Sequence, residues 1–179
     1  LVGFLIAAIL SFLKVSDETE ALKKVPWGTL LLITGVGMLM NIITKLGGIN
    51  ILSGALVSIM TESTAPSIMG LCAGITSWFS STSGVVMPTL IPTIPYINAQ
   101  MGNVLNPVEL ATAITMISNT GGISPLSTGG ALALAAYTSA AGSTPEDQQK
   151  LFMTMFGFSS LGIVVLSTLA YFGLFRWLL

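Results

Sequence analysis

Charge is what this sequence has least of. Only 7% of its 179 residues are charged, whereas about 25% are charged in a typical soluble domain, whose surface faces water. Because 53% of the residues are hydrophobic, most of the surface is expected to face lipid. The net charge of -1 lacks the basic footprint that phosphate binding needs, which argues against a nucleic-acid partner.

Histidine is absent and cysteine occurs once, at Cys72. Without histidine the chain lacks the commonest general base, which argues against a hydrolase. The apolar stretches hold no His, Cys or acidic cluster that could bind a transition metal. We therefore expect a protein that is not an enzyme and that has no cofactor and no transition-metal site.

The chain opens on a short apolar run, residues 1–13, that lacks the basic start and cleavage site of a signal peptide. About 20 residues are needed to span a bilayer, so we expect 1–13 to be a truncated helix of a C-terminal fragment. The charged stretch 14–26 follows as a connector. Its Lys14, Lys23 and Lys24 place it in the cytoplasm by the positive-inside rule.

Three further segments read as membrane helices or arms. Residues 27–45 are long enough to span, and residues 148–178 can span with a tilt. Residues 46–60 are too short to span and suit an interfacial arm helix. Thr144 followed by Pro145 and two acids predicts the start of the last helix. This order puts the loop 142–149 inside and the C-terminus outside.

Residues 67–101 have the pattern of a re-entrant hairpin. The first arm has 13 residues and as a helix would cover only ~20 Å of a hydrocarbon core ~30 Å thick. Four hydroxyl residues, Ser80 to Ser83, and then Gly84 follow at membrane depth. Non-helical backbone is tolerated there only inside protein or beside water, so this run is expected to form the tip. Prolines interrupt any straight helix in the return arm; they are Pro88, Pro92 and Pro95.

Residues 107–141 predict a discontinuous membrane helix. Asn106 and Pro107 form a cap and a first helical position. A polar, glycine-rich run, SNTGGISPLSTGG, then interrupts the apolar pattern before it resumes. Glycine and proline at such a break leave backbone groups without helical partners.

The two polar breaks together predict a binding site near the midplane. Helix starts attract carboxylates and free carbonyls coordinate cations. Neither break contains Lys or Arg, so an anion would be held by dipoles, hydroxyls and a bound cation. The alternative is that Ser, Thr, Gly and Pro only help membrane helices to pack. Two such dense runs in apolar segments favour the binding site, because every freed backbone group in lipid costs free energy.

The motifs resemble a known family. KKVPWGTLLLITGVGML is similar to a helix of the divalent anion:sodium symporter family and its ion-transporter superfamily. TSWFSSTSGVVMPTLIP resembles that family's second hairpin tip, and SPLSTGGALALA resembles the unwound stretch of its last broken helix. The dense SNTGGISPLSTGGALALA is most similar to the malonate/dicarboxylate carrier branch.

The resemblance assigns site residues by position. Ser81, Thr82 and Ser83 take the places of the signature Ser, Asn and Thr, and Ser127 and Thr128 those of the unwound helix, all as substrate-binding residues. Residues expected to bind the cation come from the same two breaks: Ser80, Thr82, Gly84, Ser124 and Gly129. A literal Ser118-Asn119-Thr120 also occurs, and we interpret it as a coincidence of letters that could still line the site.

The resemblance also implies a fold and a function. The fold is an all-α integral membrane protein, here one inverted-repeat half with transmembrane helices, a re-entrant hairpin and a discontinuous helix. The function is sodium- or proton-coupled symport of a small di- or tricarboxylate, by rigid-body, elevator-type alternating access. Expected partners are the lipid bilayer, a carboxylate anion, the missing N-terminal half and a second copy in a homodimer. The expected location is the inner (plasma) membrane, as a multi-pass protein.

Two alternatives stay open. The first is an exchanger for inorganic anions or cations, although proton antiporters usually carry an intramembrane acid. Glu62 and Glu109 are instead expected at helix ends near water. The second is a membrane enzyme or assembly subunit, although an intramembrane protease needs a base or paired acids that the apolar segments lack.

Overall fold

The computed structural model describes residues 3, 6, 8, 11, 12, 18–23, 27–140 and 144–178, and every regular element in them is helical. The chain divides into two compact units, Leu1–Leu32 and Ile33–Leu179. The first unit contains α2 (Glu18–Lys23) and the first residues of α3 (Trp27–Lys45). The helix expected over 1–13 lies largely outside the described residues. So do Lys14 and Lys24 of the expected connector.

One helix among the described residues, α10 (Pro145–Tyr171), is long and apolar enough to cross a membrane by itself. The segments Thr34–Lys45 and Gly48–Val57 meet the same test only as a pair, and they are bent by 82°. The second segment is α4, and Gly47 before it has a φ of +78°. Glycine adopts this left-handed conformation without strain. The stretch expected to form an arm helix therefore leaves α3 at nearly a right angle.

The stretch expected to form the hairpin is two helical arms joined by a short turn. The first arm is α5 (Ala65–Trp78). The return arm is a succession of short helical pieces: η1 (Thr82–Val86, a π-helix), α6 (Met87–Leu90), η2 (Ile91–Thr93, a 3-10 helix) and α7 (Ile94–Gln100). Pro88 and Pro95 each stand at the start of an α piece, where a missing N–H costs least. The prolines thus change the helix type along the arm without opening a gap in it.

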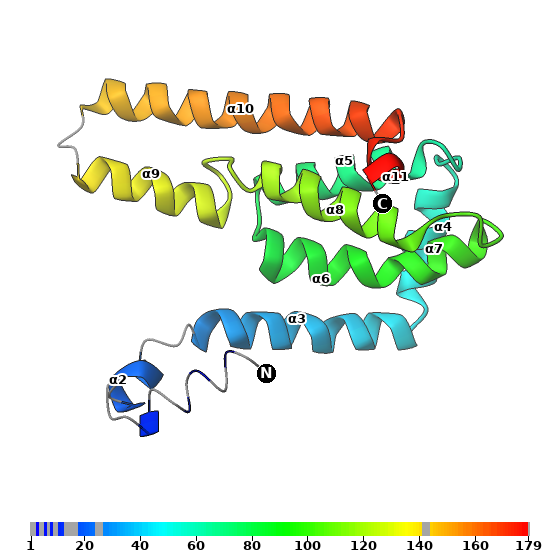
Figure 1. Cartoon of the computed structure of the whole chain (residues 1–179), viewed down its shortest axis with the longest axis horizontal. Helices are drawn as coiled ribbons and strands as arrows, with labels where there is room; N and C mark the ends of the chain where they lie inside the picture. Colours follow the sequence, from blue (N-terminus) through cyan, green and yellow to red (C-terminus); the bar gives the residue numbers. More distant parts are fainter. Residues whose placement is uncertain are drawn as a thin grey trace. The chain divides into compact units, whose positions relative to one another are not determined.

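The stretch expected to form a discontinuous helix consists of α8 (Pro107–Gly121), a break at 122–127, and α9 (Thr128–Ala140). Asn106 caps α8 as predicted, because its side-chain oxygen accepts from the N–H groups of Val108 and Glu109. Figure 1 shows α8 and α9 following one another along the length of α10. The break therefore lies about midway along the longest helix.

The last long helix, α10, begins and ends earlier than the helix expected over 148–178. Thr144 caps α10 through a capping box with Asp147, and Pro145 is its first residue. The helix ends at Tyr171, because the chain turns at Gly173, whose φ is +79°. A short α11 (Leu174–Leu178) follows.

The core of the second unit forms where α5 and α8 pack against each other and both pack against α10. Small residues allow the backbones to approach closely. A Cβ added at Gly121 would lie 2.4 Å from the carbonyl oxygen of Gly74, and one at Gly70 would overlap Ile117. Around this contact, apolar side chains from both hairpin arms and α8 are buried: Met69, Ala73, Val86, Ile94, Ile97, Leu110 and Ile114.

Candidate anion-binding site

The hairpin tip lies against the end of α8. The Thr82 hydroxyl donates to the carbonyl oxygen of Ser118 at 3.1 Å. The Ser77 hydroxyl forms a short hydrogen bond with the same Thr82 oxygen. Because Thr82 has one hydroxyl hydrogen and gives it to Ser118, Ser77 is the donor in that second bond. Thr82 therefore joins the first arm, the tip and α8.

Gly122 is the meeting point of the two polar breaks. A Cβ added there would lie 2.6 Å from the Thr82 hydroxyl oxygen, so the tip fits against this glycine. The Gly122 carbonyl accepts from the Ser127 hydroxyl at 2.6 Å. A Cβ added at Gly129 would lie 3.6 Å from the same carbonyl oxygen. The structure thus brings Thr82, Ser127 and Gly129, all expected site residues, around one glycine.

Several expected site hydroxyls are already used to hold the backbone. The one hydroxyl hydrogen of Ser127 is shared between the Gly122 and Ser124 carbonyl oxygens, at 2.6 and 2.7 Å, and the same oxygen accepts from the Gly130 N–H. Ser124 is fully buried and accepts from the Leu126 N–H at 3.2 Å. At the tip, Ser80 donates to the Thr76 carbonyl at 2.9 Å. These side chains shape the two breaks.

The Ser81 side chain also holds the backbone, whereas the hydroxyls of Ser83 and Thr128 are free. Ser81 caps η1 by accepting from the N–H of Gly84, a buried residue, at 3.1 Å. Ser83 and Thr128 are exposed, and neither hydroxyl bonds to another residue that the structure describes. Of the expected substrate-binding residues, these two are available to a ligand.

Backbone N–H groups add to the free donors. Thr82 and Ser83 open the helical run that continues to Gln100, and Thr128 and Gly129 open α9. None of their N–H groups donates to another backbone carbonyl in the part of the chain that the structure describes. The first N–H groups of a helix and its dipole favour an anion. Two helix starts of this kind flank Gly122.

A residue of α10 holds the end of α8 beside the break. The buried Ser159 hydroxyl lies 3.1 Å from the carbonyl oxygens of both Thr120 and Gly121. The indole N–H of Trp78, at the end of α5, donates to the Ser159 oxygen at 3.0 Å. Three helices are therefore fixed to one another within one turn of the candidate site.

Sequence reasoning missed two residues of this arrangement, Ser77 and Ser159, and it named Ser118 only as part of a string that could still line the site. Ser118 begins the literal Ser-Asn-Thr string that we interpreted as coincidental, yet its carbonyl receives the tip hydroxyl of Thr82. Asn119 in the same string is exposed. The string itself was the available signal for Ser118. Ser77 and Ser159 carried none, since single serines are common in membrane helices.

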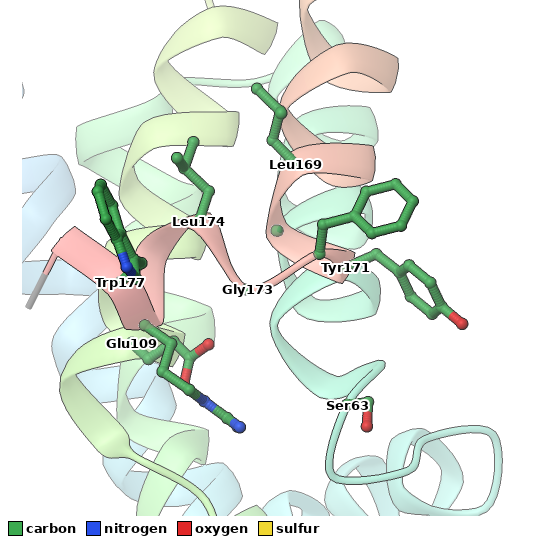
Figure 2. A pocket seen from close by; sticks show the side chains of 10 residues that line it. Ser63, Glu109, Leu169, Tyr171, Gly173, Leu174 and Trp177 are labelled. Atoms are coloured by element: carbon green, nitrogen blue, oxygen red, sulfur yellow. The ribbon is translucent and has the colours of Figure 1, made fainter.

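A cavity of about 590 Å³ lies elsewhere, between the end of α10, α11 and the first turn of α8 (Figure 2). Glu109 lines it and is only 2% exposed. Its carboxylate oxygen Oε2 is 3.3 Å from Nε of Arg176. Glu109 stands at a helix end as expected, in the first turn of α8, but the expectation that it lies near water was wrong. The reason is that α11 folds back over the first turn of α8 and covers it.

The family comparison decides the identity of the chain. The model of a family described as citrate transporter matches residues 1–115. The chain belongs to the citrate transporter family. The match includes the hairpin and the first part of α8, and it ends before the break. No curated protein and no solved structure matches the chain.

Membership of the citrate transporter family confirms the coarser part of the sequence-based expectation. This is a family of membrane transporters within the ion-transporter superfamily, and the protein is not an enzyme. The family description is that of a carboxylate transporter. The described residues contain no group of three or more His, Cys, Asp or Glu side chains that could hold a metal ion.

Proposed function

We propose that this protein is part of a secondary active transporter that binds a small carboxylate anion between the hairpin tip and the broken helix. The observation that carries the proposal is that two helix starts with free N–H groups flank Gly122. Each start can receive one carboxylate. The free hydroxyls of Ser83 and Thr128 would orient it.

A substrate with two or more carboxylates fits this arrangement best. The family description names citrate, a tricarboxylate. The resemblance to the malonate/dicarboxylate carrier branch predicts a smaller dianion. These predictions are distinguished by measuring which of the two, citrate or a smaller dicarboxylate, inhibits uptake at the lower concentration.

We further propose that sodium or a proton binds together with the anion. No Lys or Arg occurs at residues 79–84 or 118–130, so a bound dianion would leave negative charge in a poorly solvated site. Carbonyl and hydroxyl oxygens are the ligands that hard cations prefer. The proposed ligands lie near the two breaks: Ser80, Thr82, Gly84, Ser124 and Gly129. Anion and cation would then strengthen each other's binding.

The proposed mechanism is displacement of the hairpin and broken helix as one body against a scaffold. Trp78, Ser159 and the end of α8 are already joined by hydrogen bonds, which supports movement of these elements together. The scaffold and the partner hairpin would come from the N-terminal half of an inverted repeat. The homodimer and the inner-membrane location also stay predictions from the family resemblance.

The test is uptake into proteoliposomes that contain the full-length protein. We expect labelled citrate or a dicarboxylate to enter, driven by a sodium or proton gradient. The double substitution Ser83→Ala and Thr128→Ala should lower uptake at subsaturating substrate at least about tenfold, since hydrogen bonds to a charged group contribute about 1.5–3 kcal/mol each. Thr138→Ala, on the same α9 but bonded to the Ala135 carbonyl, is the matched control.

Two outcomes would contradict the proposal. Uptake that is unchanged in the double variant would remove the tip and the break from the site. Affinity that does not change across a sodium series and a pH series would exclude a coupling ion. Transport of phosphate or sulfate without carboxylate transport would support the alternative, an exchanger for inorganic ions.

A further inference from the structure

The cavity beside Glu109 is built from parts of three helices that are distant in sequence. It is lined by the end of α10, the turn at Gly173, α11, and the first turn of α8, with Ser63 from the loop before α5. Figure 2 shows Glu109 and Trp177 on one side of the opening and Tyr171 on the other. At about 590 Å³ it has the size of a small-molecule site.

The charges at the cavity do not balance. Arg176 bonds to the buried Glu109 through Nε at 3.3 Å, and its guanidinium also lies 4.0 Å from a carboxylate oxygen of Glu62. Two acidic side chains therefore share one guanidinium, so the cluster has one more acidic than basic group. The Arg176 side chain is 55% exposed. Because a guanidinium has five N–H donors, it can still bind an anionic group.

The wall on the α10 side is apolar and exposed. Phe172 is 77% exposed and Leu169 is 38% exposed. Leu169 lies in the last turn, and Phe172 directly after the end, of the one helix among the described residues that can span a membrane alone. Tyr171 and Trp177 stand at the same end of it, and such residues gather at headgroup depth. The cavity thus adjoins the exposed apolar side chains of α10, such as Val165, which would face lipid if this helix spans the membrane.

We propose that this cavity binds a phospholipid whose headgroup carries a phosphate and a primary ammonium, as in a phosphatidylethanolamine. The ammonium would offset the excess carboxylate charge at Glu62 and Glu109. The phosphate would accept from the free donors of Arg176. One acyl chain would lie along Leu169 and Phe172. An anionic lipid would instead add negative charge to a cluster that already has an excess of it.

The first experiment measures lipid binding to the full-length protein in detergent by native mass spectrometry. Phosphatidylethanolamine and phosphatidylglycerol with identical acyl chains are compared. We expect retention of phosphatidylethanolamine at lower added concentration. Equal retention of both lipids, or retention of neither because another part of the protein fills the cavity, would overturn the proposal.

The second experiment locates the bound lipid with exposed residues whose replacement leaves the fold intact. Glu62→Gln should weaken phosphatidylethanolamine binding about two- to fivefold, the loss expected for one exposed ion pair, and should reduce the preference over phosphatidylglycerol. Phe172→Ala should weaken binding of both lipids. The controls are Glu146→Gln and Phe158→Ala, which change exposed residues elsewhere on α10. Effects of equal size in the controls would overturn the assignment to this cavity.

A third measurement separates the headgroup from the chain. Soluble phosphoethanolamine, which lacks acyl chains, should compete only weakly for the lipid. Competition as strong as that of the intact lipid would show that the apolar wall has no part in binding. The proposal of a lipid site would then be wrong.

Discussion

The two ends of α8 hold their surroundings in opposite ways. At its start, Glu109 is buried in an ion pair with Arg176 beside an aromatic cavity. At its end, the break at Gly122 contains no charged side chain, and hydroxyls and backbone groups bond to one another. At the start of α8, the contact with neighbouring helices is made by an ion pair between side chains. At its end, the contact is made by close backbone approach, which is possible because the glycines there have no side chain.

The largest effect is expected from one added methyl group at the break. A Cβ at Gly130 would lie 1.9 Å from the carbonyl oxygen of Ser124, a backbone atom that cannot rotate away. Gly130→Ala should therefore displace the whole turn, abolish uptake and destabilise the protein by about 1–3 kcal/mol or more. Thermal unfolding of the purified protein and uptake measure it.

Gly129→Ala is the matched control for that prediction. A Cβ at Gly129 meets its nearest atom outside the neighbouring residues at 3.6 Å, an ordinary contact distance. Its thermal stability should stay close to that of the parent protein. If both alanine variants are equally stable, the break is not held by close backbone packing.

A smaller effect is expected from removing the charge at the other end of α8. Arg176→Met keeps a long side chain but leaves the buried Glu109 carboxylate without its cation. The loss should be about 1–2 kcal/mol, less than for a fully buried pair, because Arg176 is half exposed. Thermal unfolding again measures it, and Arg176→Lys should recover part of the stability. A variant as stable as the parent would show that the ion pair does not hold α11.

The smallest effect on stability is expected at Gly122. A Cβ there would meet the Thr82 hydroxyl oxygen at 2.6 Å, and this side chain can turn aside. Gly122→Ala should cost about 1 kcal/mol, the value of the lost Thr82 bond. It should also lower uptake, since the tip is displaced from the break. Unchanged uptake with unchanged stability would show that the contact between tip and break is not needed.

Local features of this fold could be read from the sequence, and contacts between distant segments could not. Asn106 and Thr144 predicted two helix starts because a cap depends on neighbouring residues only. The burial of Glu109 depends on α11, more than 60 residues later, and on the turn at Gly173. Its apolar neighbours in sequence gave no indication of a partner cation.

The candidate site shows the same difference between local features and contacts made in the folded structure. The density of hydroxyls and glycines marked both breaks. Which hydroxyls are free could not be read, because Ser83 and Ser127 look alike in sequence. They differ in the structure since the Ser127 hydroxyl is buried against the carbonyls of Gly122 and Ser124, whereas Ser83 is exposed.

The bonds between α5 and α10 have a consequence for how the hairpin could move. Near one end of α5, the Ser67 hydroxyl donates to the Ser167 carbonyl at 2.7 Å, and at the other end Trp78 donates to Ser159. Both ends of this arm are thus tied to the longest helix. The tip is joined to α5 and to α8 through the Thr82 hydroxyl, which accepts from Ser77 and donates to the Ser118 carbonyl. Because Val86, Ile94 and Ile97 of the return arm are also buried in the core with α5 and α8, the hairpin has no arm that is free to move alone, and its two arms would have to travel together with α8 and α10.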